Sequence, residues 1–241
     1  MNSGFLFVDK PKNITSFAVI EYLRKITQIK KIGHAGTLDP FASGLLIIGI
    51  GRKATKLLGN FLKKEKIYLA EIEFGKITDT WDPEGKIIFK KQNLTPLSLD
   101  KIRKTLSSFI GEIYQTPPKF SAKKIKGKRA YELARVGKEV KLPSQKVKIF
   151  YIKILKYQWP ILKIETKVSS GCYLRSLAYD IGKKLGCGAY LKNLKRIQIG
   201  KISLKEAVPL KKLNSSNWKK FLVSCNFDEL LKNKENSNKK K

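Results

Sequence analysis

The apolar run LLIIGIG, residues 45–51, constrains the fold more than any other stretch of the sequence. It holds no charge, although charged residues make up 29% of the chain. A short continuous apolar run of this kind predicts a strand that is buried on both of its faces. A helix is predicted directly after it, through ATKLLGNFLKK.

Two other stretches show the alternation of a strand with one buried face. In KIYLAEIEFG the inward positions are Tyr68, Ala70, Ile72 and Phe74, which places the Tyr68 hydroxyl at the end of an apolar face. In ILKIETKV the inward positions are Leu162, Ile164, Thr166 and Val168.

The remaining elements mix strands and helices in irregular order. Strands are predicted in GFLFVDKP and RIQIGKISL, and residues 76–88 form a turn into a hairpin. Helices are predicted in SFAVIEYLRKI, with Ser16 as the N-cap, in SLDKIRKTLSSFIG and in SSGCYLRSLAYDIGKKLG. This order predicts an α/β (α+β) protein with a largely antiparallel mixed sheet.

The charge of the chain points to a polyanionic partner. There are 51 basic and 19 acidic residues, a formal net charge of +32. A charge of this size repels itself in the compact state unless a polyanion neutralises it, and nucleic acid is the first candidate. The alternative is a lysine-rich surface without a specific partner.

Nine basic residues lie between Lys119 and Lys141, around the helical piece AYELARVG. This segment is predicted to be a mobile clamp.

Several other classes of protein are not indicated. Cys172, Cys187 and Cys225 are odd in number and lack a CxxC spacing, which argues against a zinc site or a disulfide framework. No stretch has the length and apolar character of a membrane span or a leader peptide. We therefore expect a soluble, reduced, cytoplasmic protein. A docking helix is expected in WKKFLVSCNFDELL, followed by a disordered basic tail.

The loop GHAGTLDPFASG, residues 33–44, holds one isolated carboxylate, Asp39, and the chain's only histidine, His34. Asp39 could cap a single helical turn, with Pro40 at its first position and Gly44 at its end. Alternatively, Asp39 is a nucleophile. Just downstream, Gly49, Gly51 and Ala54 fit a dinucleotide-binding pattern, but Arg52 and Lys53 place charge inside the turn and argue against it.

Arg175 lies in the first turn of a predicted helix, where a cation is unfavourable unless an anion compensates it. It is either solvent-exposed or a fixed guanidinium that faces a carboxylate or phosphate. A site made of Asp39, Tyr68, Tyr173 and Arg175 has one carboxylate and no histidine base. It suits attack on, or deprotonation of, a reactive carbon, with an aromatic ring that stacks a flipped base.

Seven blocks occur in the order of one known family. In chain order the blocks are DKP, GHAGTLDPFASGLLIIGIGRKATK, KIY, TDTWDPEG, PPKFSAKKIKGKRAYELARVG, GCYLRSLAYDIGKKLGCGAYL and LKRIQIG. Together they resemble the bacterial tRNA pseudouridine-55 synthases, the TruB family. The resemblance covers about residues 4–210. It implies the pseudouridine synthase fold and the isomerisation of one uridine in the T loop of tRNA without a cofactor, metal or ATP.

The resemblance also assigns residues. Asp39 is the nucleophile, Arg175 pairs with it, and Tyr68 stacks the base, which makes these three the expected catalytic residues. The other expected substrate contacts are His34, Tyr173 and Leu194. The basic thumb, about residues 117–143, is expected to close over the RNA stem-loop, with RNA contacts from Lys123, Lys124, Lys126, Lys128, Arg129 and, outside the thumb, Arg196.

The resemblance further implies a monomer whose partner is tRNA, with no membrane and no metal. The expected catalytic domain is 1–213, and 214–241 form a C-terminal helix and tail without the PUA domain of many family members. Two other functions stay open: a guide-RNA-dependent pseudouridine synthase, and a non-catalytic RNA-binding or tRNA-folding protein.

Overall fold

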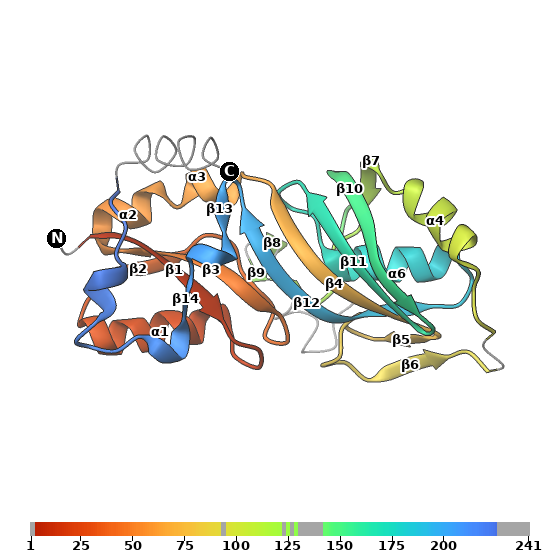
Figure 1. The fold of residues 1–241 in the computed structure, drawn as a ribbon, viewed down its shortest axis with the longest axis horizontal. Coiled ribbons are helices and arrows are strands. Elements are labelled where there is room, and N and C mark those ends of the chain that lie inside the picture. The colour runs from red at the N-terminus through yellow and green to blue at the C-terminus, as the bar shows by residue number, and fades with distance from the viewer. Residues whose placement is uncertain (1–2, 93–94, 122–123, 126–127, 130–141, 226–241) are drawn as a thin grey trace. The chain divides into compact units, whose positions relative to one another are not determined.

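The computed structural model describes residues 3–92, 95–121, 124–125, 128–129 and 142–225. The chain divides into two compact units (Figure 1). Unit 1 comprises Met1–Ile67 and Lys195–Lys241, and unit 2 comprises Tyr68–Leu194. Along the sequence, unit 2 is therefore an insertion into unit 1. The chain enters it through strand β4 (Lys66–Phe74) and leaves it through strand β12 (Ala189–Ile199).

The sheet of unit 1 is organised around strand β3. One edge of β3 pairs antiparallel with β1, and its other edge pairs with β2 antiparallel and with the end of β12 parallel. The elements of unit 1 are β1 (Gly4–Lys10), α1 (Ser16–Thr27), β2 (Ile32–His34), β3 (Ser43–Ile50), α2 (Gly51–Leu57), α3 (Gly59–Leu62), β13 (Ile202–Ser203), β14 (Val208–Pro209), and the 3₁₀ turns η1 (Leu204–Glu206), η2 (Leu210–Lys212) and η3 (Trp218–Phe221).

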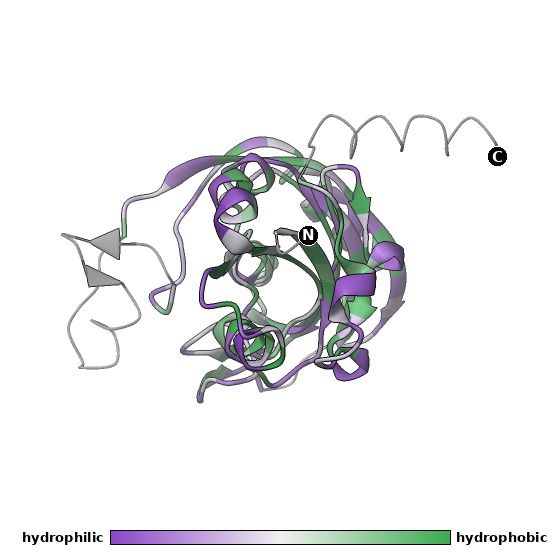
Figure 2. Ribbon diagram, turned by 90° about the vertical axis from the view of Figure 1, so that its left-hand side faces the viewer, coloured by the Kyte–Doolittle hydropathy of each residue, from purple (hydrophilic) through white to green (hydrophobic). Residues whose placement is uncertain are grey.

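The apolar run is a strand buried on both faces, as its sequence predicts. Leu46, Ile48 and Ile50 belong to an apolar cluster with residues of α1. Leu45 and Ile47 point the other way, into a second cluster with α2 and α3. Because each face of the strand meets its own helix layer, no polar position interrupts the run. Figure 2 shows the hydrophobic colour of the strands in this unit.

The predicted N-cap of α1 is wrong by one residue. Thr15 is the N-cap, and its hydroxyl accepts a hydrogen bond from the Ala18 amide at 2.9 Å. Ser16 is the first residue of the helix, and its side chain turns instead to Leu38.

The predicted docking helix is also wrong over the described residues. Trp218–Phe221 form a single 3₁₀ turn, and Val223 then pairs with Phe5 as an isolated β-bridge. Trp218 is nevertheless buried in the α1 cluster, so the chain beyond residue 213 still packs on unit 1 as far as it is described. The predicted basic tail lies outside the described residues.

Unit 2 has a main sheet in the order β12, β4, β11, β10, β7, and α4 and α6 cover one of its faces (Figure 1). The elements not yet introduced are β5 (Lys76–Thr78), β6 (Ile87–Lys90), α4 (Leu99–Ser107), β7 (Gly111–Gln115), β8 (Lys124–Ile125), β9 (Lys128–Arg129), β10 (Gln145–Gln158), β11 (Ile161–Val168) and α6 (Leu174–Lys184). The predicted hairpin over residues 76–88 is present as the antiparallel pair β5–β6.

The alternation predicted for this sheet is confirmed. All four inward positions of β4 and all four of β11 are buried. The pairs β10–β11 and β10–β7 are antiparallel, in agreement with the predicted sheet type. The intervening positions of these strands, which include Glu71, Lys163 and Lys167, point away from the buried side. The second face of this sheet is thus lined by charged side chains.

Candidate active site

Asp39 lies in the loop between β2 and β3, and side chains from other elements hold the residues on both sides of it. The Ser16 hydroxyl accepts from the Leu38 amide at 2.9 Å and donates to the Leu38 carbonyl at 3.0 Å. The Pro40 carbonyl accepts from the Asn13 amide at 2.8 Å and from Lys10 Nζ at 3.3 Å. The backbone of Asp39 is therefore fixed by hydrogen bonds that leave its position in the loop little freedom.

The alternative of a helical turn that starts at Asp39 and ends at Gly44 is met only in its first residues. Residues 39–42 form a turn closed by a backbone bond from the Ala42 amide to the Asp39 carbonyl at 3.1 Å. Gly44, expected at the end of a helix, lies in strand β3 with φ +104°. A Cβ atom at Gly44 would overlap the backbone of Arg196, which explains the glycine.

Arg196 supports the same loop from β12. Its Nε donates to the Leu45 carbonyl at 2.8 Å, and its Nη2 donates to the Gly36 carbonyl at 3.0 Å. The side chain is only 1% exposed. Arg196 was expected to contact RNA, whereas its described hydrogen bonds join the two ends of the Asp39 loop. An RNA contact by Arg196 stays a prediction.

His34, at the end of β2, is uncharged at neutral pH in this environment. Burial, and secondarily the nearby charge of Arg196, lower the pKa of its imidazole below the usual 6.5. Its Nδ1 has no hydrogen-bond partner among the described residues. A neutral imidazole with an unused ring nitrogen can donate to or accept from a ligand, depending on its tautomer.

Arg175 is buried in unit 2, so a solvent-exposed role is wrong. It is 4% exposed, and its Nη1 forms an ion pair with Asp82 Oδ2 at 3.0 Å. Nη1 also donates to the Thr80 carbonyl at 3.2 Å, and Nη2 to the Phe120 carbonyl at 2.8 Å. Asp82 provides an anion of the kind that the helix-dipole argument requires. The predicted pairing of Arg175 with Asp39 would join the two units and stays a prediction.

Asp82 is the functional candidate that residue-level reasoning missed. Its Oδ1 accepts from Thr80 Oγ1 at 2.6 Å and from the Glu84 amide at 3.0 Å. These two hydrogen bonds orient the carboxylate, whose other oxygen pairs with Arg175. The available signal was its place in TDTWDPEG, one of the blocks shared with the family.

The residues around the start of α6 are also fixed from within unit 2. The backbone amide of Tyr173, the N-cap residue, donates to Gln115 Oε1 at 2.7 Å. The Ser176 hydroxyl donates to the Thr116 carbonyl at 2.7 Å. Tyr68 and Leu194 are buried in the same unit. The segment that carries Tyr173 and Arg175 is thereby tied to the end of β7.

Comparison with known proteins identifies the family. Residues 24–174 match the family model described as TruB family pseudouridylate synthase (N terminal domain), and residues 175–236 match the tRNA pseudouridylate synthase B C-terminal domain. The chain belongs to the TruB family. It is therefore an isomerase of the pseudouridine synthase type.

The TruB relatives cover almost the whole chain. The tRNA pseudouridine synthase B of Clostridium acetobutylicum is 45% identical over 230 residues, 95% of this chain and 78% of that protein. The protein of the same name from Aquifex aeolicus is 47% identical over 223 residues, 91% of this chain and 77% of that one.

Solved structures confirm the fold. A chain in the crystal structure of a Cbf5-Nop10-Gar1 complex matches 90% of this chain with a TM-score of 0.71 and 28% identity. The match covers 56% of that chain, so this protein spans little more than half of the solved protein's length.

The thumb of this TruB chain is described only in part. Lys124, Lys128 and Arg129 lie in the short antiparallel strands β8 and β9. Lys123, Lys126 and the predicted helix AYELARVG lie outside the described residues.

The described part of the chain contains no cluster of His, Cys, Asp and Glu suited to a metal ion. None of its helices is both long and apolar enough to cross a membrane.

Proposed function

We propose that this TruB chain converts uridine to pseudouridine at position 55, in the T loop of tRNA, without a metal or cofactor. Membership of the family carries the reaction class, and the names of the bacterial relatives favour tRNA as the substrate. The observation that supports Asp39 as the nucleophile is the bracing of its loop by Ser16, Lys10 and Asn13. A nucleophile held in one place by its backbone loses little freedom when it attacks.

The roles of the other residues follow from their chemistry. Tyr68 stacks the extruded uracil, and Tyr173 and Leu194 line the space around it. Arg175 orients and balances charge in the catalytic centre, and its rigid anchoring by Asp82 suits that role. His34, neutral at pH 7, contacts the nucleotides displaced from the loop. The thumb residues and Arg196 are the proposed contacts to the RNA backbone.

The decisive experiment replaces the carboxylate of Asp39 by an isosteric amide. Asp39→Asn is expected to abolish pseudouridine formation in a T-arm transcript, because an amide is not a competent nucleophile. Binding of the transcript should persist. Nucleoside chromatography of the digested RNA measures turnover, and filter binding measures affinity.

The matched control is Asp100→Asn. That carboxylate is 90% exposed on α4, and within the described part of the chain its one ion-pair partner is Arg103. Asp100→Asn should keep wild-type turnover. If Asp39→Asn retained turnover, Asp39 would not be the nucleophile. The reaction would then have to be catalysed by other residues.

A guide-dependent synthase is the second candidate function. The fold match to a Cbf5 chain in complex with Nop10 and Gar1 favours it, although that identity is lower than the identity to the bacterial relatives. Incubation of the purified chain with a bare tRNA transcript decides between them. Modification without guide RNA or partner proteins supports the proposed function, and a strict need for a guide supports the alternative.

A further inference from the structure

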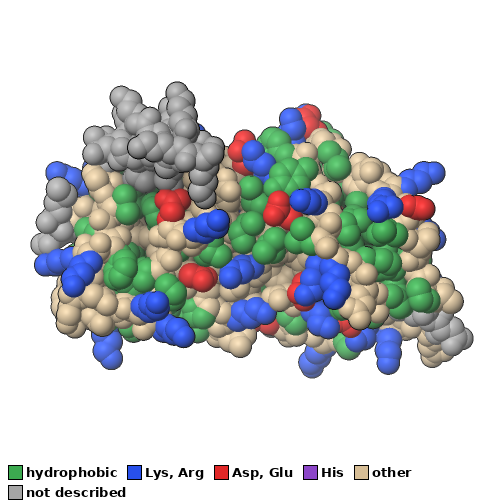
Figure 3. Space-filling model, in the orientation of Figure 1, with side chains coloured by type: hydrophobic (Ala, Val, Ile, Leu, Met, Phe, Trp, Pro, Cys, Tyr) green, Lys and Arg blue, Asp and Glu red, His purple; other side chains and the backbone are tan. Residues whose placement is uncertain are grey.

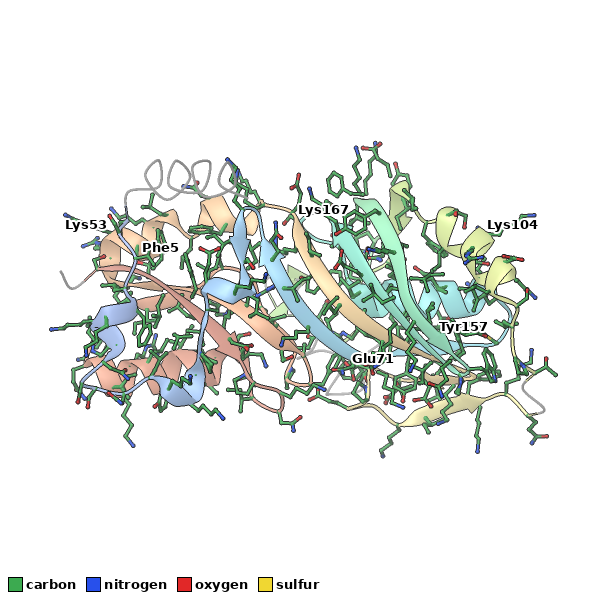
Figure 4. All side chains as sticks on the ribbon, in the orientation of Figure 1. Phe5, Lys53, Glu71, Lys104, Tyr157 and Lys167 are labelled. Carbon is green, nitrogen blue, oxygen red and sulfur yellow. The ribbon has the colours of Figure 1, made fainter. Side chains whose placement is uncertain are left out.

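A hollow of about 340 Å³ opens on the charged face of the unit 2 sheet. Trp159, Gln158, Lys156, Lys163, Lys192 and Glu71 line it, and we call it the lysine–tryptophan pocket. These residues come from β4, β10, β11 and β12 and from the turn between β10 and β11. Figure 4 labels Glu71 on β4.

The pocket is separate from the candidate active site within unit 2. Tyr68 and Glu71 are three residues apart on the same strand, so their side chains point to opposite faces of β4. A ligand in the pocket would therefore lie across the sheet from the ring that is proposed to stack the target uracil.

The positive charge of the pocket is only partly compensated. Lys156 and Lys163 are direct partners across the antiparallel pair β10–β11, and like charges in such positions repel. Lys163 reaches Glu71 at 2.7 Å, whereas Lys156 has no ion-pair partner in the described part of the chain. A phosphate between these two ammonium groups would remove the repulsion.

The third lysine, Lys192, shares its partner with other groups. It pairs at 2.8 Å with Glu73, which also accepts from Lys76 at 2.6 Å and from the Tyr190 hydroxyl at 2.8 Å. Burial opposes ionisation of Glu73, but these hydrogen bonds outweigh it and lower its pKa to about 2. The lining thus has three cations and one lining carboxylate. Figure 3 shows that blue Lys and Arg side chains are widespread on the face drawn there.

An aromatic ring and an amide complete the pocket. Trp159 stacks on Phe74 with ring centres 5.8 Å apart and an interplanar angle of 16°, and Tyr157 meets it edge-on. Because Phe74 covers one face of the indole, the ring is held in place where it lines the pocket. Gln158 is exposed and its amide can donate and accept at once. Lysines beside an immobilised ring are the chemistry that binds single-stranded nucleic acid.

We propose that the lysine–tryptophan pocket binds one nucleotide of single-stranded RNA, with its phosphate on Lys156 and Lys163 and its base against Trp159. This is a second RNA site, distinct from the target uridine. It rests on the proposed function only in taking RNA as the polyanion that this family handles.

The test measures binding of a fluorescein-labelled oligouridylate six-mer to the full chain by anisotropy. A saturating unlabelled T-arm stem-loop is present, so that the catalytic site is occupied. The double variant Lys156→Gln/Lys163→Gln should weaken binding of the six-mer about tenfold, because two phosphate contacts are lost. The control Lys101→Gln/Lys104→Gln removes the same charge from exposed positions of α4 and should change binding less than about twofold.

A second variant tests the ring. Trp159→Leu should weaken binding about tenfold through the lost stacking. Its melting temperature is measured alongside, because Phe74 loses its partner. Ultraviolet crosslinking of the six-mer to the wild-type chain, with mapping of the modified peptide, gives a measurement that needs no variant and should identify residues 156–163.

Equal binding by the two double variants, or crosslinks that map elsewhere, would overturn the proposal. So would binding of phosphatidylglycerol vesicles through these lysines without binding of the six-mer. The stem-loop is assayed for pseudouridine in the same samples. If the wild-type chain makes none while the six-mer still depends on Lys156 and Lys163, the proposed function fails and the pocket stands.

Discussion

At the scale of single residues, the buried pair Arg175–Asp82 determines where the guanidinium of the candidate site lies. Both side chains are buried, their charged atoms lie 3.0 Å apart, and neighbouring backbone and hydroxyl groups bond to each. A buried ion pair adds little by itself compared with a packed apolar pair, but removal of one partner leaves an uncompensated charge. The pair therefore fixes where the guanidinium lies more than it stabilises the fold.

Asp82→Asn should lower the free energy of unfolding by about 3 kcal/mol, because it leaves Arg175 charged and buried. Turnover per enzyme should fall as well, since the guanidinium is no longer held in place. Urea unfolding and single-turnover pseudouridine formation measure the two effects. Asp79→Asn, an exposed carboxylate on the same connection that accepts from the Lys86 amide, is the control. Equal losses in both variants would contradict the role given to Asp82.

The sequence predicted that Arg175 needs an anion but could not identify this one. The argument from the helix dipole is local, and it applies to any carboxylate that the fold brings near. Asp82 lies 93 residues earlier in the chain, in a turn whose geometry depends on Thr80 and Glu84. The family resemblance supplied Asp39 as the partner of Arg175. The spacing of residues in the sequence gives no sign that a second carboxylate, Asp82, also pairs with this arginine.

At the scale of elements, the loop that carries Asp39 is held by side chains from both ends of unit 1. Ser16 serves both backbone groups of Leu38, and Arg196 joins Gly36 to Leu45. These residues are about 20 and 160 positions from the loop along the chain. The loop is therefore rigid because tertiary contacts brace it, which its glycine-rich sequence does not indicate.

Ser16→Ala should slow pseudouridine formation while tRNA binding stays near wild type. The variant leaves the buried amide and carbonyl of Leu38 without their shared partner, at a cost of about 1 to 3 kcal/mol in stability. Turnover at saturating tRNA and the urea midpoint are measured together. Ser107→Ala, an exposed serine that donates to the Arg103 carbonyl of its own helix, is the control. A variant with unchanged turnover would show that the brace is not needed for catalysis.

Helix α6 carries a carboxylate whose ionisation opposes folding. Burial raises the pKa of Asp180 to about 6, against an opposing effect of Lys183. The unfolded-state pKa of an aspartate is about 3.9. An acid with a raised folded-state pKa contributes stability below its unfolded-state pKa and loses it as pH rises through the folded-state value. The contribution of Asp180 is thus lost between about pH 4 and pH 6.

Asp180→Asn should therefore stabilise the protein above pH 6, on the order of 1 kcal/mol, because the amide carries no charge to desolvate. The gain should shrink as pH falls and vanish near pH 4. Urea unfolding of wild type and variant across this range measures it. A gain that is constant with pH would mean that packing of the amide, and not ionisation, is the cause.

Elements with a regular pattern of apolar residues were predictable from the sequence. The exact start of a helix and the structure of the C-terminal segment were not. The alternation in β4 and β11 and the unbroken run in β3 follow from how many faces each strand buries. Thr15 and Ser16 are chemically equivalent as caps, and the choice between them depends on Leu38, a distant contact. Trp218 was placed in a helix by its spacing, whereas its burial against α1 needs only one 3₁₀ turn.

At the scale of the whole molecule, the excess of positive charge sets how the chain meets RNA. The net charge of +32 comes mostly from lysines, which are flexible point charges suited to phosphate and carry little sequence information. In the lysine–tryptophan pocket three such lysines lie together, and the single carboxylate of the lining does not balance their charge. Affinity for tRNA should therefore be governed by counterion release, while the choice of the target uridine belongs to the catalytic residues.

Affinity for tRNA should fall steeply with salt. If about four phosphates are neutralised, an increase in monovalent salt from about 50 to about 200 mM should weaken binding about a hundredfold. The measurement uses the Asp39→Asn variant, so that turnover does not change the RNA during titration. Turnover of the wild-type enzyme at saturating tRNA should change far less over the same range, because the bound complex has already released its counterions. A flat plot of affinity against salt would mean that uncharged contacts dominate, and the excess lysines would then need another explanation.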